Sequence, residues 1–417
     1  MKYDLAVIGG GPAGMMAAGH AGELGARVVL LEKNRSLGIK LLMAGKGRCN
    51  ITNKTEDPKE LAAVYGKSGK FLLSALSRFG VDDVINFFES RGVKTKVERG
   101  NRVFPISDKG RDVLDVLIDY LKESKVEVKF GSAVKEIIVG VDGSQPKKIE
   151  KILLHNGGEI TADKFIIATG GKSYPTSGSS GDAYSWLAKL GHTIITPRPA
   201  LTPVIVKENF IKELEGLSLK NVEISLFENN KKIFSEFGEA LFTNNGLSGP
   251  IVIDMSKKIG EELPKKIIIK IDFKPALDFV KLDERILRDF QESNNKLFRN
   301  SLDKLLPQKL IPVIIRLSKI NPDKRVNLIT KEERRNLVHL LKEFSLEVVD
   351  LVGFEKAIVT TGGVDLREVD PKTMQSKIID NLYLAGEVLN IDGPTGGYNL
   401  QVCWTTGHVA GENVNNE

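Results

Sequence analysis

The strongest constraint on the fold is a glycine-rich turn close to the N-terminus. Residues 9–14 read Gly-Gly-Gly-Pro-Ala-Gly, which matches G-x-G-x-x-G, and they follow an apolar run at residues 3–8. Small and apolar residues continue over 12–24, as expected of a helix packed on a sheet, and a second apolar run covers 27–31. This order predicts a β-α-β unit that binds a dinucleotide.

The positions within this unit have distinct expected roles. Gly9 permits the tight turn, Gly11 lets the backbone approach a pyrophosphate, and Gly14 allows close packing of the helix. The helix N-terminus offers N–H groups and the positive end of its dipole to the phosphates. Glu32 ends the second strand, where a carboxylate can accept hydrogen bonds from an adenosine ribose. The motif alone does not distinguish NAD from FAD.

Composition narrows the class of protein. A chain of 417 residues, 41% hydrophobic and 27% charged, is expected to form two or three globular domains. Its 60 basic residues stand against 54 acidic ones, so the net charge of +6 is mild and no nucleic acid is expected as a partner. The N-terminus does not resemble a signal peptide, and we find no apolar run typical of a membrane span, so no membrane partner is expected. Two cysteines without a disulfide framework fit the reducing cytoplasm.

The order of predicted elements indicates one domain interrupted by another. Buried strands are expected at 164–169 and 382–385, each followed by glycine. Three prolines within 196–203 should resist both helix and central strand, so we place a domain boundary there. Alternating runs over 204–272 predict an antiparallel sheet or small barrel, and 277–345 predicts charged amphipathic helices. The predicted domains are residues 1–197, 198–354 and 355–417, of which the first and last form one dinucleotide-binding domain.

Shorter elements are also expected within the first part of the chain. They are helices at 71–79, 82–91 and 109–123, strands at 126–130 and 133–139, an extended loop at 37–53, and a hairpin at 140–163 with its turn at 140–143.

The polar, glycine-rich segment 38–53 is a second candidate binding element. Arg48 and Asn50 offer hydrogen-bond donors to an anionic or carbonyl-rich ligand, and Gly45 and Gly47 let the backbone approach it. An ordinary surface loop explains the same residues.

A third candidate element lies near the C-terminus. A strand ending in Ala-Gly-Glu at 385–387 and a Gly-Gly pair at 396–397 that opens a helix make a second place where backbone donors converge. Such donors suit the electron-rich pyrimidine edge of a flavin. A plain helix cap explains the glycines equally well, but not why the strand pattern of the dinucleotide domain stays unfinished until this segment.

Together these residues resemble a bacterial flavoprotein family described variously as aminoacetone oxidases and as BaiN-type bile-acid reductases. The resemblance covers nearly the whole chain. The motifs that carry it are GGGPAG, GKGRCNITN, RVFP (102–105), ATGGKSYPTSGSSGDAY (168–184), LSGP (247–250), TTGGV (360–364), TMQSK (373–377) and AGEVLNIDGPTGGYNLQ (385–401). Two positions depart from a common family form, since Lys46 replaces the central glycine of G-G-G-R-C-N and Asn390 stands where Asp is frequent.

The resemblance implies an α/β protein with a glutathione-reductase-like FAD-binding Rossmann domain, formed by both chain ends, and an inserted domain that is part β-barrel-like and part helical. It also implies a set of cofactor-binding residues: Gly9, Gly11, Pro12, Ala13, Gly14, Glu32, Lys33, Lys40, Gly47, Arg48, Cys49, Asn50, Val134, Thr169, Gly170, Gly386, Glu387, Gly397, Tyr398, Asn399 and Leu400. The first part of this set would hold the ADP half, with Val134 near adenine, and the last part would surround the isoalloxazine.

The two cysteines do not indicate thiol or metal chemistry. The sequence has no C-x-x-C and no Cys/His cluster with metal-ligand spacing, so we expect no metal site. For Cys49 we favour a packing or flavin-lining role over a redox role, because disulfide reductases of this fold use a closely spaced pair. A Cys49–Cys403 bridge stays open, since the resemblance brings both segments near the flavin.

Catalytic residues are not identified by any motif. Tyr174, Tyr398 and Arg102 could contact substrate as an aromatic wall, a phenol donor and an anion anchor, although a structural role is the commoner use of each. His192 and His408 are most simply explained as packed or capping residues.

The expected function is an FAD-dependent oxidoreductase acting on a small organic molecule. It would be either a reductase of a carbonyl-conjugated double bond, with NADH or NADPH docking transiently, or an amine or aminoketone oxidase. The inserted domain has no second G-x-G-x-x-G, which argues against a separate NAD(P)H domain. Rival hypotheses are a flavin-dependent RNA-modifying protein and a flavin-binding interaction protein without turnover. The oligomeric state is not encoded in any motif.

Overall fold

A computed structural model describes residues 2–55, 57–140 and 147–413 of the chain. These residues form two compact units, each with its own hydrophobic core. Unit 1 consists of Met1–Pro199 and Ala357–Glu417, and unit 2 of Ala200–Lys356. Both ends of the chain therefore belong to the same unit.

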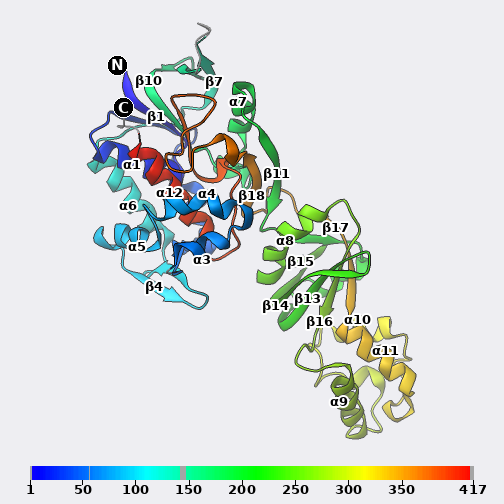
Figure 1. Cartoon of the computed structure of the whole chain (residues 1–417). Coiled ribbons are helices and arrows are strands. Elements are labelled where there is room, and N and C mark those ends of the chain that lie inside the picture. The colour runs from blue at the N-terminus through cyan, green and yellow to red at the C-terminus, as the bar shows by residue number, and fades with distance from the viewer. Residues whose placement is uncertain (1, 56, 141–146, 414–417) are drawn as a thin grey trace. The chain divides into compact units, whose positions relative to one another are not determined.

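Unit 1 is built on a five-stranded parallel sheet (Figure 1). Its strand order is β19 (Leu382–Leu384), β10 (Ala162–Ile167), β1 (Tyr3–Ile8), β2 (Val28–Leu31) and β6 (Glu127–Lys129). Strands β2 and β19 are apolar and buried throughout, and β1 and β10 are apolar and buried over 5–8 and 165–167, as is usual in parallel sheets. Because β19 completes the sheet from the far end of the chain, the predicted α/β fold class is confirmed.

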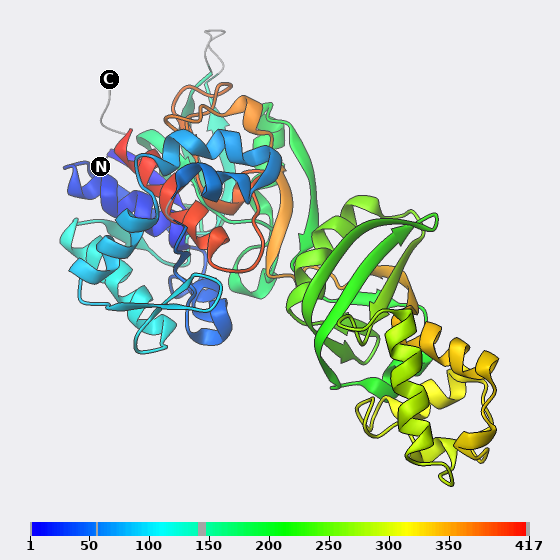
Figure 2. The same ribbon diagram turned by 60° about the horizontal axis from the view of Figure 1, so that its bottom comes forward.

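Two helices from opposite ends of the chain pack side by side in unit 1 (Figures 1 and 2). Helix α1 (Pro12–Glu23) contributes its alanines, and helix α12 (Tyr398–Glu412) contributes glycines. A Cβ atom added to Gly407 would lie 2.4 Å from the Ala13 carbonyl oxygen, and one added to Gly411 would lie 2.5 Å from that of Ala17. A step of four residues along α12 thus corresponds to a step of four residues in the same direction along α1. The two helices therefore run parallel, with their backbones in close contact.

The remaining elements of unit 1 surround this framework. Its helices are α2 (Ile39–Met43), α3 (Pro58–Ala63), α4 (Gly69–Leu76), α5 (Val81–Ser90), α6 (Gly110–Glu123) and α7 (Asp182–Leu190). Small antiparallel sheets are formed by β3 (Thr52–Asn53), β5 (Arg102–Pro105) and β4 (Thr95–Glu98), and by β7 (Val134–Val139), β8 (Ile149–Leu154) and β9 (Glu159–Ile160). The 3-10 helices of the described chain are Ala44–Gly47, Gly66–Ser68, Pro175–Ser177, Asn209–Leu214, Phe298–Asn300, Val326–Leu328, Leu366–Glu368 and Gly386–Val388.

The structure tests two predicted segments of unit 1 in detail. The extended loop predicted at 37–53 is wrong in its first half, because α2 and the 3-10 turn at Ala44–Gly47 occupy it. Within the range predicted as a hairpin, β8 pairs antiparallel with β9, and β8 also pairs with β7, which precedes the range. Most of the predicted turn, 141–143, lies outside the described residues.

The proline-rich segment before unit 2 is a strand. Strand β11 (Ile194–Ala200) contains Pro197 and Pro199 and pairs with β18 (Val359–Val364) in a two-stranded sheet. Both strands of such a sheet are edge strands, and proline is tolerated there because the missing N–H does not break a central ladder.

Unit 2 contains a closed barrel and a group of helices. The barrel order is β12 (Val204–Val206), β15 (Gly246–Ser248), β14 (Lys231–Thr243), β13 (Ser218–Glu228), β16 (Ile267–Asp272) and β17 (Phe344–Leu351). Helix α8 (Pro250–Glu262) precedes β16, and α9 (Phe279–Gln291), α10 (Ile311–Ser318) and α11 (Lys331–Lys342) separate β16 from β17. The barrel-like and helical parts of the inserted domain are thereby confirmed. Among the described helices of the whole chain, none has the length and apolarity to cross a membrane.

Candidate functional site

The glycine turn after β1 has the geometry of a dinucleotide-binding loop. Gly9 has a φ of +108°, and a Cβ there would lie 2.6 Å from the Ala168 carbonyl oxygen. A Cβ on Gly14 would lie 1.9 Å from the Gly9 carbonyl oxygen, whereas one on Gly11 would meet no atom within 4 Å. Gly11 is the N-cap of α1 and no side chain caps it, so the cap residue leaves the N–H groups of the first helical turn to other acceptors.

Glu32 lies directly against this loop. Its carboxylate accepts hydrogen bonds from the Gly10 N–H at 2.9 Å and the Asn34 N–H at 2.7 Å, and the side chain is buried. Each oxygen keeps a lone pair for a ribose hydroxyl. The neighbouring Lys33 instead pairs with Asp182 at 2.6 Å, and Val134 is buried at the start of β7.

Two buried polar atoms in the segments predicted to bind the cofactor have no hydrogen-bond partner in the protein. They are Oγ1 of Thr169, whose Cα lies beside Gly9, and Oδ1 of Asn50 in the predicted polar segment. Buried polar atoms are rarely left unpaired, since each unmet hydrogen bond costs about 1–3 kcal/mol. A bound polar cofactor would satisfy both atoms. The residues present therefore fit the dinucleotide that the sequence predicts.

The polar segment 44–50 is held in a strained shape. Gly45, Lys46, Gly47 and Cys49 all have φ between 59° and 86°. The Arg48 guanidinium forms paired hydrogen bonds to Glu98 at 2.9 and 3.1 Å, a further bond to Asp108 at 3.1 Å, and lies 3.9 Å from the centre of the Phe104 ring. Its donors are thus directed to carboxylates of this unit, which the sequence could not reveal.

The C-terminal segment forms the other side of the candidate site. Gly397 has a φ of +102° and is the N-cap of α12, without a side-chain cap. The Asn399 side chain bonds both the N–H and the carbonyl oxygen of Gly393 at 2.9 Å and fixes the preceding loop. Tyr398 starts the helix and its carbonyl accepts from Tyr65 at 2.9 Å, while Leu400 packs on the core.

A partly buried network surrounds Glu387. Its Oε2 accepts from Lys40 at 2.7 Å, and its Oε1 accepts from the Ser173 hydroxyl at 3.0 Å and the Thr360 N–H at 2.7 Å. Lys40 also donates to Ser173 at 2.6 Å. Four segments distant in sequence thus meet at one carboxylate. No sequence motif indicated Ser173 or Thr360 as partners, because the contacts depend on the tertiary fold.

Two predicted glycines lie next to this network. A Cβ on Gly170, which has a φ of +74°, would lie 2.6 Å from the Ser179 hydroxyl and 3.9 Å from Glu387 Oε2. The N–H of Gly386 donates to Thr406 in α12 at 2.9 Å.

The two cysteines are both free thiols. Burial raises the pKa of Cys49 to about 12, and burial together with the charge of Glu387 raises the pKa of Cys403 to about 12. Both groups are therefore protonated at neutral pH, which is the unreactive form.

The proposed substrate-contacting residues come from different elements of unit 1, with Tyr174 before the 3-10 turn at Pro175–Ser177, Arg102 in β5 and Tyr398 in α12. Tyr174 is half-buried with a φ of 52°. Arg102 is exposed and its Nε donates to the Arg99 carbonyl at 3.0 Å. His192 is buried and bonds Glu368 at 3.2 Å and Ser376 at 2.9 Å, which accounts for it structurally.

Comparison with known proteins identifies the family. The model of the HI0933-like protein Rossmann domain matches residues 3–413. The chain belongs to this family. It is 31% identical over 411 residues to a 3-dehydro-bile acid delta(4,6)-reductase of Clostridium scindens, covering 98% of each chain. It is 29% identical over 416 residues to a ribosomal RNA dihydrouridine synthase of Escherichia coli, covering 99% of this chain and 98% of that one.

Solved structures share the fold. A 3-ketosteroid delta1-dehydrogenase of Sterolibacterium denitrificans superposes with a TM-score of 0.54 at 13% identity, covering 99% of each chain. A flavocytochrome c3 fumarate reductase gives a TM-score of 0.52 at 17% identity, covering 99% of this chain and 78% of that one. The family, together with the 31% identity to a reductase over nearly the whole chain, places the chain among the FAD-dependent oxidoreductases.

Proposed function

We propose that the chain binds FAD along the carboxyl edge of the parallel sheet in unit 1. The Gly9–Gly14 turn and Glu32 would hold the ADP half, and Asn50 and Thr169 would use their unpartnered atoms on the cofactor. The segments at 386–387 and 397–400 would flank the flavin ring. Arg48 would act by fixing the loop through Glu98 and Asp108.

The unpartnered hydroxyl of Thr169 offers a direct test of this placement. In Thr169→Val we expect FAD affinity to fall about fivefold, as for one lost hydrogen bond of about 1 kcal/mol. The same change should leave the FAD-free protein as stable or more stable, because it removes a buried polar atom without a partner. Fluorescence titration of the FAD-free protein measures the first and denaturant unfolding the second.

Thr243 provides the matched control for this test. Its Oγ1 is also buried without a partner, but it lies in β14 of unit 2. Thr243→Val should not change FAD affinity. Equal FAD affinity in the Thr169→Val and unaltered proteins would remove Thr169 from the proposed site.

The proposed reaction is reduction of a carbon–carbon double bond conjugated to a carbonyl, with NADH or NADPH as a transient donor. The observation that carries it is the likeness to a delta(4,6)-reductase over 98% of both chains. Bound FAD supplies the hydride transfer. The chain's own residues would orient the cofactor. The uncapped N-terminus of α12 would offer its N–H groups and the positive end of its dipole to the negative charge that develops during reduction.

The hydrogen bonds around Glu387 would hold the segments of the proposed site in place relative to one another. Lys40 and Ser173 hold its carboxylate at 2.7 and 3.0 Å, so the strand end at β19 stays tied to the loop that follows β10. These residues are positioning residues, because none of their bonds requires the substrate.

Anaerobic stopped-flow mixing of the FAD-loaded protein with NADH or NADPH tests the reductase half-reaction. Rapid loss of the visible flavin absorbance is expected, followed by its return when an enone is added. A flavin that neither nucleotide bleaches, but that an amine or aminoketone does, would contradict the reductase proposal and support an oxidase.

Modification of RNA is a second candidate function. The observation in its favour is 29% identity to a ribosomal RNA dihydrouridine synthase over nearly the whole of both chains. Dihydrouridine is uridine whose ring double bond, conjugated to a carbonyl, has been reduced, so the bond chemistry is the same and only the substrate is larger. Incubation of rRNA that lacks dihydrouridine with the enzyme and NADPH, followed by nucleoside mass spectrometry, distinguishes the two.

A further inference from the structure

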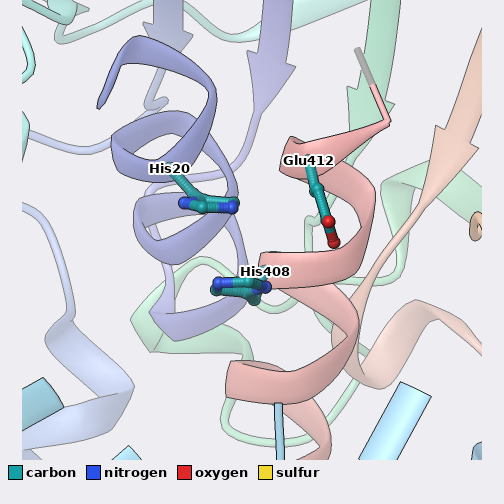
Figure 3. A group of neighbouring side chains, drawn as sticks. All are labelled: His20, His408 and Glu412. Carbon is teal, nitrogen blue, oxygen red and sulfur yellow. The ribbon is translucent and has the colours of Figure 1, made fainter. Parts of the chain in front are cut away.

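A cluster of metal-ligating side chains lies outside the proposed cofactor site. His20 in the last turn of α1, and His408 and Glu412 in α12, each offer a ligand atom, and these atoms all lie within 4.8 Å of one another. Figure 3 shows the three side chains directed toward a common space between the two helices. No motif predicted this cluster, because His20 and His408 come from opposite ends of the chain.

The spacing within α12 suits a shared ligand. His408 and Glu412 are four residues apart, so both project from one face of the helix. Nδ1 of His408 is buried and has no hydrogen-bond partner. The His408 ring stacks on Phe79 with ring centres 4.1 Å apart and on His20 at 3.8 Å, so the two imidazoles lie face to face.

His20 is oriented by a second layer of residues. Its Nδ1 lies 3.2 Å from Glu23 Oε2, which also accepts the Tyr120 hydroxyl at 2.6 Å. A histidine that donates one ring N–H to a carboxylate keeps its other nitrogen, here Nε2, as a lone pair for a metal. The Tyr120–Glu23–His20 arrangement has the form of the outer layer found around metal-bound histidines.

The electrostatic setting also favours a cation. Because α1 and α12 run parallel, their C-termini meet at this end of the pair, and both helix dipoles place partial negative charge there. The positive charge of Arg78 disfavours a cation here, since its guanidinium is paired with Glu412. A metal ion would have to take Glu412 from Arg78.

We propose that His20, His408 and Glu412 bind one Zn²⁺ ion that links α1 to α12. Two imidazoles and one carboxylate are a recurrent ligand set for Zn²⁺, with the fourth position left to water. The stacked rings would splay to bring their nitrogens to one ion. The site links segments from the two ends of the chain and lies far along α1 from the glycine turn.

Calorimetric titration of the untagged, FAD-loaded protein with ZnCl2 tests the proposal. One equivalent should bind, and His20→Gln and Glu412→Gln should each weaken binding at least ~10-fold. Arg78→Gln should tighten it, because it removes the competing ion pair. His339→Gln, which removes an exposed histidine of unit 2, should leave it unchanged.

X-ray absorption at the zinc edge checks the ligands independently of folding. Nitrogen and oxygen neighbours at ~2.0–2.1 Å with an imidazole signature are expected. Absence of saturable binding, affinity equal in His20→Gln and the unaltered protein, or a sulfur neighbour at ~2.3 Å from a cysteine would overturn the proposal.

Discussion

Lys46 stands at a backbone position that suits glycine better. Its φ of 59° and ψ of 41° are left-handed, and its side chain is exposed. This conformation costs a residue with a Cβ about 1–2 kcal/mol. Lys46→Gly should therefore raise the free energy of unfolding by about 1 kcal/mol, less the greater entropy that glycine has in the unfolded chain.

Lys46→Ala is the control for this substitution. It removes the same charge and keeps the Cβ, so no such gain is expected. Urea unfolding of the three proteins measures the effect, and an equal gain in both variants would assign it to the charge instead of the backbone.

The protonated thiols of Cys49 and Cys403 give a prediction about pH. Burial holds both pKa values near 12, above the ordinary value of 9.0. Between pH 9 and pH 12 the thiols lose their protons in the unfolded chain but keep them in the folded protein. The contribution of the two thiols to stability is therefore complete below pH 9 and is lost as the pH rises toward 12. Iodoacetamide at pH 8 should label neither cysteine in the folded protein and both in urea. Rapid labelling of folded protein would contradict this burial.

At the scale of elements, the contact between α1 and α12 depends on Gly407. A methyl group there would lie 2.4 Å from the Ala13 carbonyl oxygen, and backbone on both sides leaves it no room. Gly407→Ala should lower the free energy of unfolding by about 1–3 kcal/mol through overpacking. Helix propensity alone predicts a gain of about 1 kcal/mol, so the sign of the change, measured by denaturant unfolding, separates the two effects.

The sequence was most informative where a repeating pattern reflects backbone geometry. Strand β1 was predicted at its observed bounds, because an apolar run before G-x-G-x-x-G leaves few alternatives. The partners of Arg48 could not be predicted, since Glu98 and Asp108 lie 50 and 60 residues further along the chain. Side-chain partners of this kind are set by tertiary packing, which a single sequence does not display.

At the scale of the whole molecule, the two units have separate interiors. The core cluster of unit 1 contains only residues before 191 and after 363, and that of unit 2 only residues 204–351. The chain leaves unit 1 through β11 and returns through β18, and a Cβ on Gly362 would lie 2.5 Å from the Thr196 carbonyl oxygen. The two connections are therefore neighbouring strands, and unit 2 is an insertion that unit 1 does not need for its core.

This arrangement predicts the result of removing unit 2. A chain in which a short glycine-rich linker replaces residues 201–356 should unfold cooperatively and keep the visible absorbance of bound FAD, since the glycine turn, Glu32 and Thr169 all lie in unit 1. Residues 200–356 expressed alone should fold without taking up FAD. A shortened chain that stays folded yet colourless would show that FAD binding also requires unit 2.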